Sequence, residues 1–145
     1  MPTIPEAIHI AIQHHQAGRL PEAEAIYRQI LEIQPANHVA LHHLGLIAHH
    51  VGQPQIAVDY MSRAIAIYPD EATCHNNLGE AYRVMGNGEK AEAHFKQATR
   101  LKPDYADAFY NLGVLLHEQG KLEEAAVYYH KALSLQPASP WASNN

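Results

Sequence analysis

Residues 74–86 read CHNNLGEAYRVMG, and residues 109–120 read FYNLGVLLHEQG. In both stretches an asparagine stands directly before Leu-Gly, and these two residues, Asn77 and Asn111, are 34 positions apart. A repeat at a fixed interval of this length indicates a protein built from stacked structural units. The same interval separates the members of four further columns along the chain: Pro35, Pro69, Pro103 and Pro137; Gly18, Gly52, Gly86 and Gly120; Ala23, Ala57, Ala91 and Ala125; and Tyr27, Met61, Phe95 and Tyr129.

Each repeat is predicted to contain two α-helices. In the second repeat Leu41, Leu44, Ile47 and Ala48 recur at the three- and four-residue spacing of one helix face. The first helix should end at the glycine column, because glycine readily adopts the left-handed conformation of a helix C-cap. The second helix should end before the proline column, since the residue before a proline avoids helical geometry. The large side chains of the fourth column should fill the space between repeats.

This pattern resembles the tetratricopeptide repeat, in which Leu-Gly, a turn glycine, alanine, an aromatic residue and proline occur at these offsets. The resemblance implies an all-α fold, an α-solenoid of antiparallel helix pairs that forms a right-handed superhelix. One repeat domain would span residues 1–139, with a truncated fifth repeat in residues 140–145, because PASPWASNN at the end aligns with PDEATCHNN at residues 69–77. The four complete repeats are expected at about residues 4–37, 38–71, 72–105 and 106–139.

The column before Leu-Gly is predicted to face a ligand. In a solenoid of this kind the first helices line the inner wall, and this column lies beside the core positions without belonging to them. An amide carries donors and an acceptor, so it can pair with the main chain of an extended peptide of any sequence. The alternative is that Asn77 and Asn111 only brace neighbouring groups of the protein. The candidate residues of the groove are His9, His43, Asn77, Asn111, His42, Tyr110 and Arg83, with Asn76, His15, His49 and His117 as further exposed positions.

The asparagine column is similar to the asparagine ladder in the repeat domain of O-linked N-acetylglucosamine transferase and its bacterial relatives. That resemblance implies that Asn77 and Asn111 clamp the backbone of a substrate, whereas His9 and His43 depart from the pattern. Some repeat domains of chaperone cofactors instead hold a C-terminal carboxylate with lysines, asparagines and an arginine. The corresponding positions here contain no lysine or arginine, so a carboxylate clamp is not expected.

Twelve histidines are present, several of them in adjacent pairs. Histidines seven residues apart on one helix are separated by about 10.5 Å, too far for one metal ion. A shared site would need histidines from adjacent repeats, such as His15 with His49 or His9 with His43. No zinc motif, phosphate loop or nucleophile motif is recognisable, so we predict no metal ion, no cofactor and no catalytic residue. A groove whose charge depends on pH is a second reading of these imidazoles. The third, which we favour, is an ordinary solvated helix surface.

Composition restricts the partners. The 145 residues have a net charge of −5, which argues against nucleic-acid binding. No apolar run is long enough for a membrane span, and Cys74 stands alone, which fits a reducing, cytoplasmic setting. We therefore predict a module that binds a protein or an extended peptide. The alternatives are a substrate-recruiting arm of a glycosyltransferase- or sulfotransferase-like enzyme, and a self-assembly scaffold. A homodimer through the C-terminal end is also expected, since terminal repeats normally need a polar cap.

Overall fold

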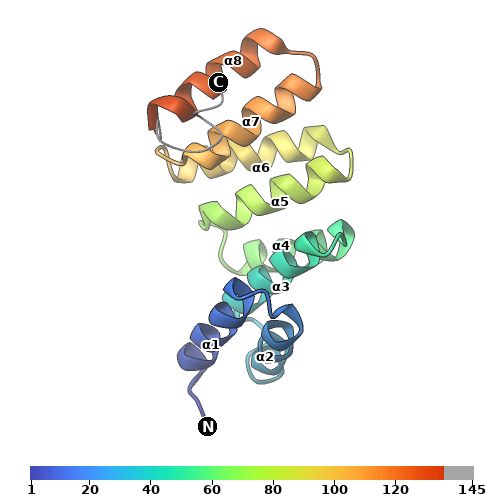
Figure 1. Ribbon diagram of the computed structural model, residues 1–145, viewed down its shortest axis with the longest axis vertical. Helices are drawn as coiled ribbons and strands as arrows, with labels where there is room; N and C mark the ends of the chain where they lie inside the picture. The colour runs from blue at the N-terminus through green and yellow to red at the C-terminus, as the bar shows by residue number, and fades with distance from the viewer. Residues whose placement is uncertain (136–145) are drawn as a thin grey trace. The chain divides into compact units, whose positions relative to one another are not determined.

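The computed structural model describes residues 1–135, all of whose regular secondary structure is α-helical. The chain is divided into two compact units: the first is Met1–Pro69, and the second begins at Asp70. The predicted fifth repeat at 140–145 lies outside the described residues. Eight helices are present in residues 1–135 (Figure 1): α1 (Ile4–Gln16), α2 (Leu20–Ile33), α3 (His38–His50), α4 (Pro54–Ile67), α5 (Ala72–Val84), α6 (Gly88–Leu101), α7 (Ala106–Glu118) and α8 (Leu122–Leu135).

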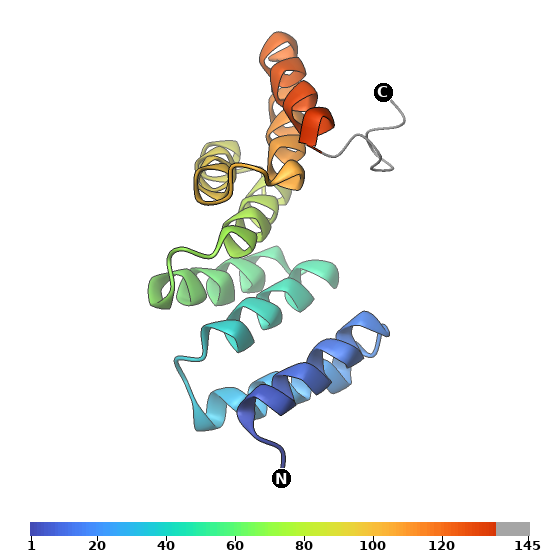
Figure 2. The ribbon, with the colours of Figure 1, turned by 90° about the vertical axis from the view of Figure 1, so that its left-hand side faces the viewer.

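The helices form consecutive pairs, one pair in each predicted repeat range. In the first unit α1 packs on α2, α2 on α3 and α3 on α4; in the second unit α5 to α8 follow the same order. Figure 2 shows the short turn that joins α1 to α2. The first helices of neighbouring pairs also touch, α1 with α3 and α5 with α7. The predicted all-α helical-repeat architecture is therefore confirmed.

In each pair, one glycine ends the first helix, as predicted. Gly18, Gly52, Gly86 and Gly120 all have φ between 79° and 81°. At the end of α1 the Gly18 N–H donates to the His15 carbonyl at 3.0 Å and the Arg19 N–H donates to the His14 carbonyl at 2.8 Å. These two bonds satisfy carbonyl groups that a helix end otherwise leaves unpaired. The last turns of the first helices are fixed in this way.

The glycine of Leu-Gly lets a large side chain pack directly on the first helix. A Cβ added to Gly79 would lie 2.7 Å from two ring carbons of Phe95 and 3.2 Å from the carbonyl oxygen of Ala91. Phe95 also belongs to a core cluster with Leu112 and Leu115 of the next pair. The ring therefore packs within its own repeat as well as filling the space between repeats. Met61 and Tyr129 have the same close relation to Gly45 and Gly113.

Helix starts follow ordinary capping chemistry. Thr3 caps α1 in a capping box with Glu6, whose backbone N–H donates to the Thr3 hydroxyl at 3.3 Å. Asn37 and Asn87 cap α3 and α6 through their side-chain oxygens. Prolines lie at the starts of α2 and α4, where the missing N–H has no helical partner to lose.

Candidate ligand-binding face

The predicted groove residues all lie on first helices. His9 is on α1, His42 and His43 on α3, Asn77 and Arg83 on α5, and Tyr110 and Asn111 on α7. His9 is exposed and the other six are half-buried. In each unit these residues occupy the pair of first helices that touch each other. We call this surface the first-helix face: α1 and α3 in the first unit, α5 and α7 in the second.

His43 is held more tightly than its position in the pattern predicts. Its ring stacks on Tyr27 with centroids 5.2 Å apart and planes 4° apart. Its Nδ1 atom is buried and has no hydrogen-bond partner among the described residues. Burial, together with the nearby imidazoles of His42 and His15, lowers the pKa of His43 from 6.5 to about 4. His43 is therefore neutral at physiological pH.

A cavity of about 470 Å³ opens on the first-helix face of the first unit. Its walls come from α1, the turn after it, the first residue of α2, and α3, so it lies where the sequence predicts ligand contact. Imidazole groups from both helices stand beside aliphatic side chains, which offers hydrogen bonding and apolar contact in one site. The lining residues are Ile12, His15, Gln16, Gly18, Leu20, His43, Leu46 and His50.

In the second unit, the side chain of Asn111 is bonded to the protein itself. The Asn111 Nδ2 donates to the Asn76 Oδ1 at 3.0 Å, linking α7 to α5. Asn76 is buried and also hydrogen-bonds Tyr105. The amide of Asn111 therefore has the bracing contact that the alternative to the ladder anticipates. It retains a second N–H, since an amide nitrogen has two hydrogens. The roles of Asn77 and Asn111 toward a ligand stay a prediction.

Arg83 connects the first helices of the second unit. Its guanidinium donates to the Glu80 carboxylate at 2.8 Å on α5 and to the Glu118 carboxylate at 2.9 Å on α7. The hydrogen bonds from Arg83 to these carboxylates raise the pKa of its guanidinium further above an already high value. On α7, Tyr110 packs against Tyr129 with ring centroids 5.6 Å apart. Both predicted residues thus also support the packing of the unit.

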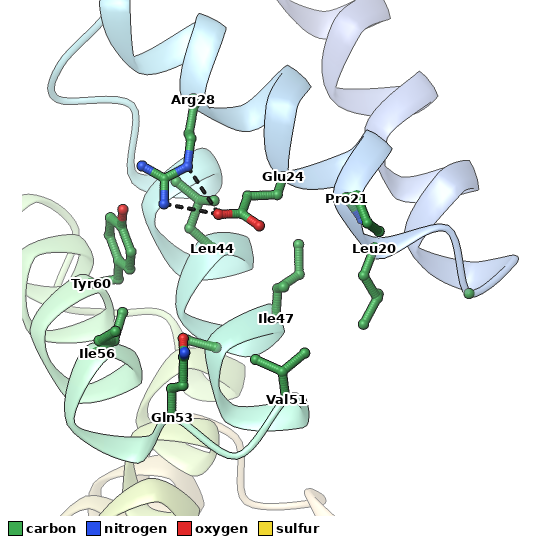
Figure 3. Close-up of a pocket in the computed structure, with 12 residues that line it drawn as sticks. Leu20, Pro21, Glu24, Arg28, Leu44, Ile47, Val51, Gln53, Ile56 and Tyr60 are labelled. Carbon is green, nitrogen blue, oxygen red and sulfur yellow. Dashed lines mark hydrogen bonds and ion pairs between the residues drawn. The ribbon is translucent and has the colours of Figure 1, made fainter.

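A second cavity, which the repeat pattern did not predict, lies between α2 and the α3–α4 pair. It has a volume of about 380 Å³, and Arg28 and Tyr60 stand at one side of it (Figure 3). The Arg28 guanidinium donates to the Glu24 carboxylate at 2.8 Å, an i, i+4 pair along α2. Ile56 and Val51, both substantially exposed, add apolar surface. In the sequence, the available signal for this cavity was the presence of aliphatic residues, Val51 and Ile56, close to the turn between two helices.

Comparisons with known proteins agree with this architecture. Helix pairs of this length, stacked through a glycine and a large side chain, define an α-helical repeat protein. Models of the tetratricopeptide repeat match residues 76–140, 37–104 and 11–29. The chain belongs to the tetratricopeptide repeat family. A comparison with curated protein sequences found no match.

Several solved structures share the fold. A crystal structure of MamA is 26% identical with a TM-score of 0.80, and the match covers 88% of this chain and 75% of that one. The pilF protein of Pseudomonas aeruginosa is 25% identical with a TM-score of 0.89, over 97% of this chain and 64% of that one. The first repeat domain of Spaghetti (RPAP3), bound to the HSP90 peptide SRMEEVD, is 25% identical with a TM-score of 0.70. That match covers 74% of this chain and 85% of the other.

Within residues 1–135 no group of three or more His, Cys, Asp or Glu side chains is arranged to hold a metal ion. Over the same residues no helix has both the length and the apolar character that crossing a membrane requires. Cys74 is buried, and burial raises the pKa of its thiol to about 12, as suits a packing residue.

Proposed function

We propose that this chain is a protein-interaction module that binds an extended peptide, or an extended segment of a protein, on its first-helix face. The observation that carries the proposal is the cavity of about 470 Å³ between α1 and α3. It coincides with the surface on which the sequence pattern places His43. A cavity of this size accepts one large side chain of a ligand, while amides and imidazoles along the face pair with its backbone.

The structural neighbour bound to the HSP90 peptide supports this class of activity, because the same fold holds a peptide there. We expect a different ligand here. Without lysine or arginine at the clamp positions, the chain has no charged groups to hold a C-terminal carboxylate. The first-helix face of the first unit has Glu6 as its one formally charged residue on α1 and none on α3, apart from the histidines. A ligand that relies on backbone hydrogen bonds and apolar side chains fits this surface.

Asn77→Ala is the sharpest test of backbone recognition. Peptides selected from a random library on the purified chain would supply the ligands, and fluorescence anisotropy would supply the affinities. One lost amide contact should weaken each peptide by about 0.5–1.5 kcal/mol, up to roughly tenfold. The loss should be similar for peptides of unrelated sequence, because the contact is to the main chain. Arg28→Ala, in the second cavity, is the matched control and should leave the affinities unchanged.

Asn111→Ala separates binding from bracing. The substitution leaves the buried Asn76 without its donor, so the free energy of unfolding should fall by about 1–3 kcal/mol. Peptide affinity, measured well below the unfolding transition, should fall as well if Asn111 uses its second N–H for the ligand. Reduced stability with unchanged affinity for every selected peptide would limit Asn111 to a structural role. Unchanged affinity in both Asn77→Ala and Asn111→Ala would refute the proposed ladder.

The finer alternatives predict different behaviour. As a substrate-recruiting arm of a glycosyltransferase- or sulfotransferase-like enzyme, the module would bind peptides that such an enzyme modifies. We expect no catalysis from the repeats themselves. As a self-assembly scaffold, it would bind further copies of itself in preference to selected peptides. Sedimentation of the chain with and without a selected peptide distinguishes the scaffold from the peptide-binding module.

A further inference from the structure

His15 and His50 come from neighbouring first helices and face each other at the cavity on α1 and α3. The distance from His15 Nε2 to His50 Nδ1 is 3.4 Å, which is long for a hydrogen bond between two rings. The ring centroids are 5.5 Å apart and the planes are inclined by 67°. The two ring nitrogens are therefore close to each other, and the rings do not stack face to face.

We propose that His15 and His50 form a binding site for a divalent transition metal ion such as Ni²⁺, Cu²⁺ or Zn²⁺. Imidazole nitrogens bind zinc at about 2.0–2.1 Å in tetrahedral geometry, which places two such nitrogens about 3.3–3.4 Å apart. The observed separation already has this value. His15 would carry its proton on Nδ1 and His50 on Nε2, so that each presents a lone pair to the ion.

The backbone, rather than an accident of side-chain conformation, brings these two positions together. The positions that correspond in the second unit, 68 residues later, are Arg83 and Glu118. Their side chains meet as an ion pair with a distance of 2.9 Å. Both units therefore place this pair of positions within reach of one interaction. The first unit has two metal-binding side chains where the second has opposite charges.

The surroundings favour a cation. His15 is in the last turn of α1, and His50 is the final residue of α3. The C-terminal end of a helix carries partial negative charge, which stabilises a positive ion close to it. The adjoining cavity leaves room for water in the remaining coordination positions.

The proposal departs from the sequence-based expectation of no metal ion, and it uses another pair of histidines than the combinations considered there. Adjacent repeats do supply the two ligands, but His15 pairs with His50 and not with His49. Within residues 1–135 no third protein ligand completes the site. We therefore expect an open site with modest affinity.

Isothermal titration of the 145-residue chain, made without a histidine tag, with NiCl₂ and ZnCl₂ tests the site. We expect one equivalent of metal to bind. In His15→Ala/His50→Ala that affinity should fall by at least about tenfold, since even outer-shell changes have effects of this size. His14→Ala/His49→Ala is the matched control, because it removes two imidazoles from the same two helix ends. Its affinity should equal that of the unmodified chain. The proposal would be overturned if the two double variants bound the metal ion with the same affinity as each other. It would also be overturned if the unmodified chain bound no metal ion.

A transplanted site gives a second test that does not depend on the folding of the first variant. Arg83→His/Glu118→His places imidazoles at the corresponding positions of the second unit. This variant should bind a second equivalent of NiCl₂. If it binds only as much metal as the unmodified chain, the spacing of these positions is not sufficient for coordination and the geometric argument fails.

Discussion

Acidification should destabilise the first unit through His43, and His43→Phe should remove this contribution. In the unfolded chain the imidazole binds a proton near pH 6.5, whereas in the folded chain its pKa is about 4. The unfolded state therefore binds more protons between these values, and stability falls as the pH falls. From these two values the free energy of unfolding should decrease by about 2 kcal/mol between pH 7.5 and pH 5, and by about 3 kcal/mol below pH 4.

Phenylalanine keeps the aromatic stack on Tyr27 but cannot titrate. It also removes the buried Nδ1 atom that has no partner among the described residues, so stability at pH 7.5 should be equal or higher. Urea unfolding followed by circular dichroism, at a series of pH values, gives the comparison. Burial also lowers the pKa of His94 to about 4, but His94 is present in both proteins, so the difference between the two curves isolates His43. His130→Phe, at an exposed position on α8, is the control. Parallel curves for the unmodified chain and His43→Phe would refute the reasoning.

Three further changes test the packing. Ala91→Leu, at a fully buried position facing Gly79, should lower the free energy of unfolding by about 1–3 kcal/mol, whereas Ala93→Leu on the exposed side of α6 should change it little; equal urea midpoints would mean that the faces of α6 are misassigned. Glu118→Gln removes the ion pair to Arg83 and should lower the same free energy by less than about 1 kcal/mol, with a smaller effect in high salt. Val127 is 65% exposed on α8, so we expect concentration-dependent association that Val127→Glu abolishes; sedimentation of a strictly monomeric chain at all concentrations would contradict this.

The fold could be predicted because each feature of the pattern has a local physical cause. A glycine with positive φ ends each first helix. Within residues 1–135 no residue other than glycine has a positive φ. Ala91 and Gly79 are small because a ring must fit between two backbones. Glu92 and Lys96, four residues apart on α6, form an ion pair at 2.7 Å. These constraints act over short distances in the sequence, so one chain is enough to reveal them.

The site was less predictable because it depends on which columns meet. The repeat has a period of 34, so equivalent residues are 34 apart, and the ladder was predicted along one such column. Side chains that touch between neighbouring first helices are instead 35 apart: His15 with His50, Asn76 with Asn111, and Arg83 with Glu118. Helical side chains lean toward the N-terminus of their helix, so the surface that one residue covers is offset from its own position.

The one-residue offset has a functional consequence. Asn111, a residue of the predicted ladder, is bonded to Asn76 of the neighbouring column. A substitution in one column therefore alters a contact made by a residue of another column. A binding site can also form from residues of two columns, although neither column indicates such a site by itself. The His15–His50 pair arises in this way, from two histidines that are not equivalent in the repeat. Asn76 in turn is buried and sets the orientation of an amide on the first-helix face. In this chain the partner of each face residue, rather than its column, decides whether it braces the fold or remains able to bind a ligand.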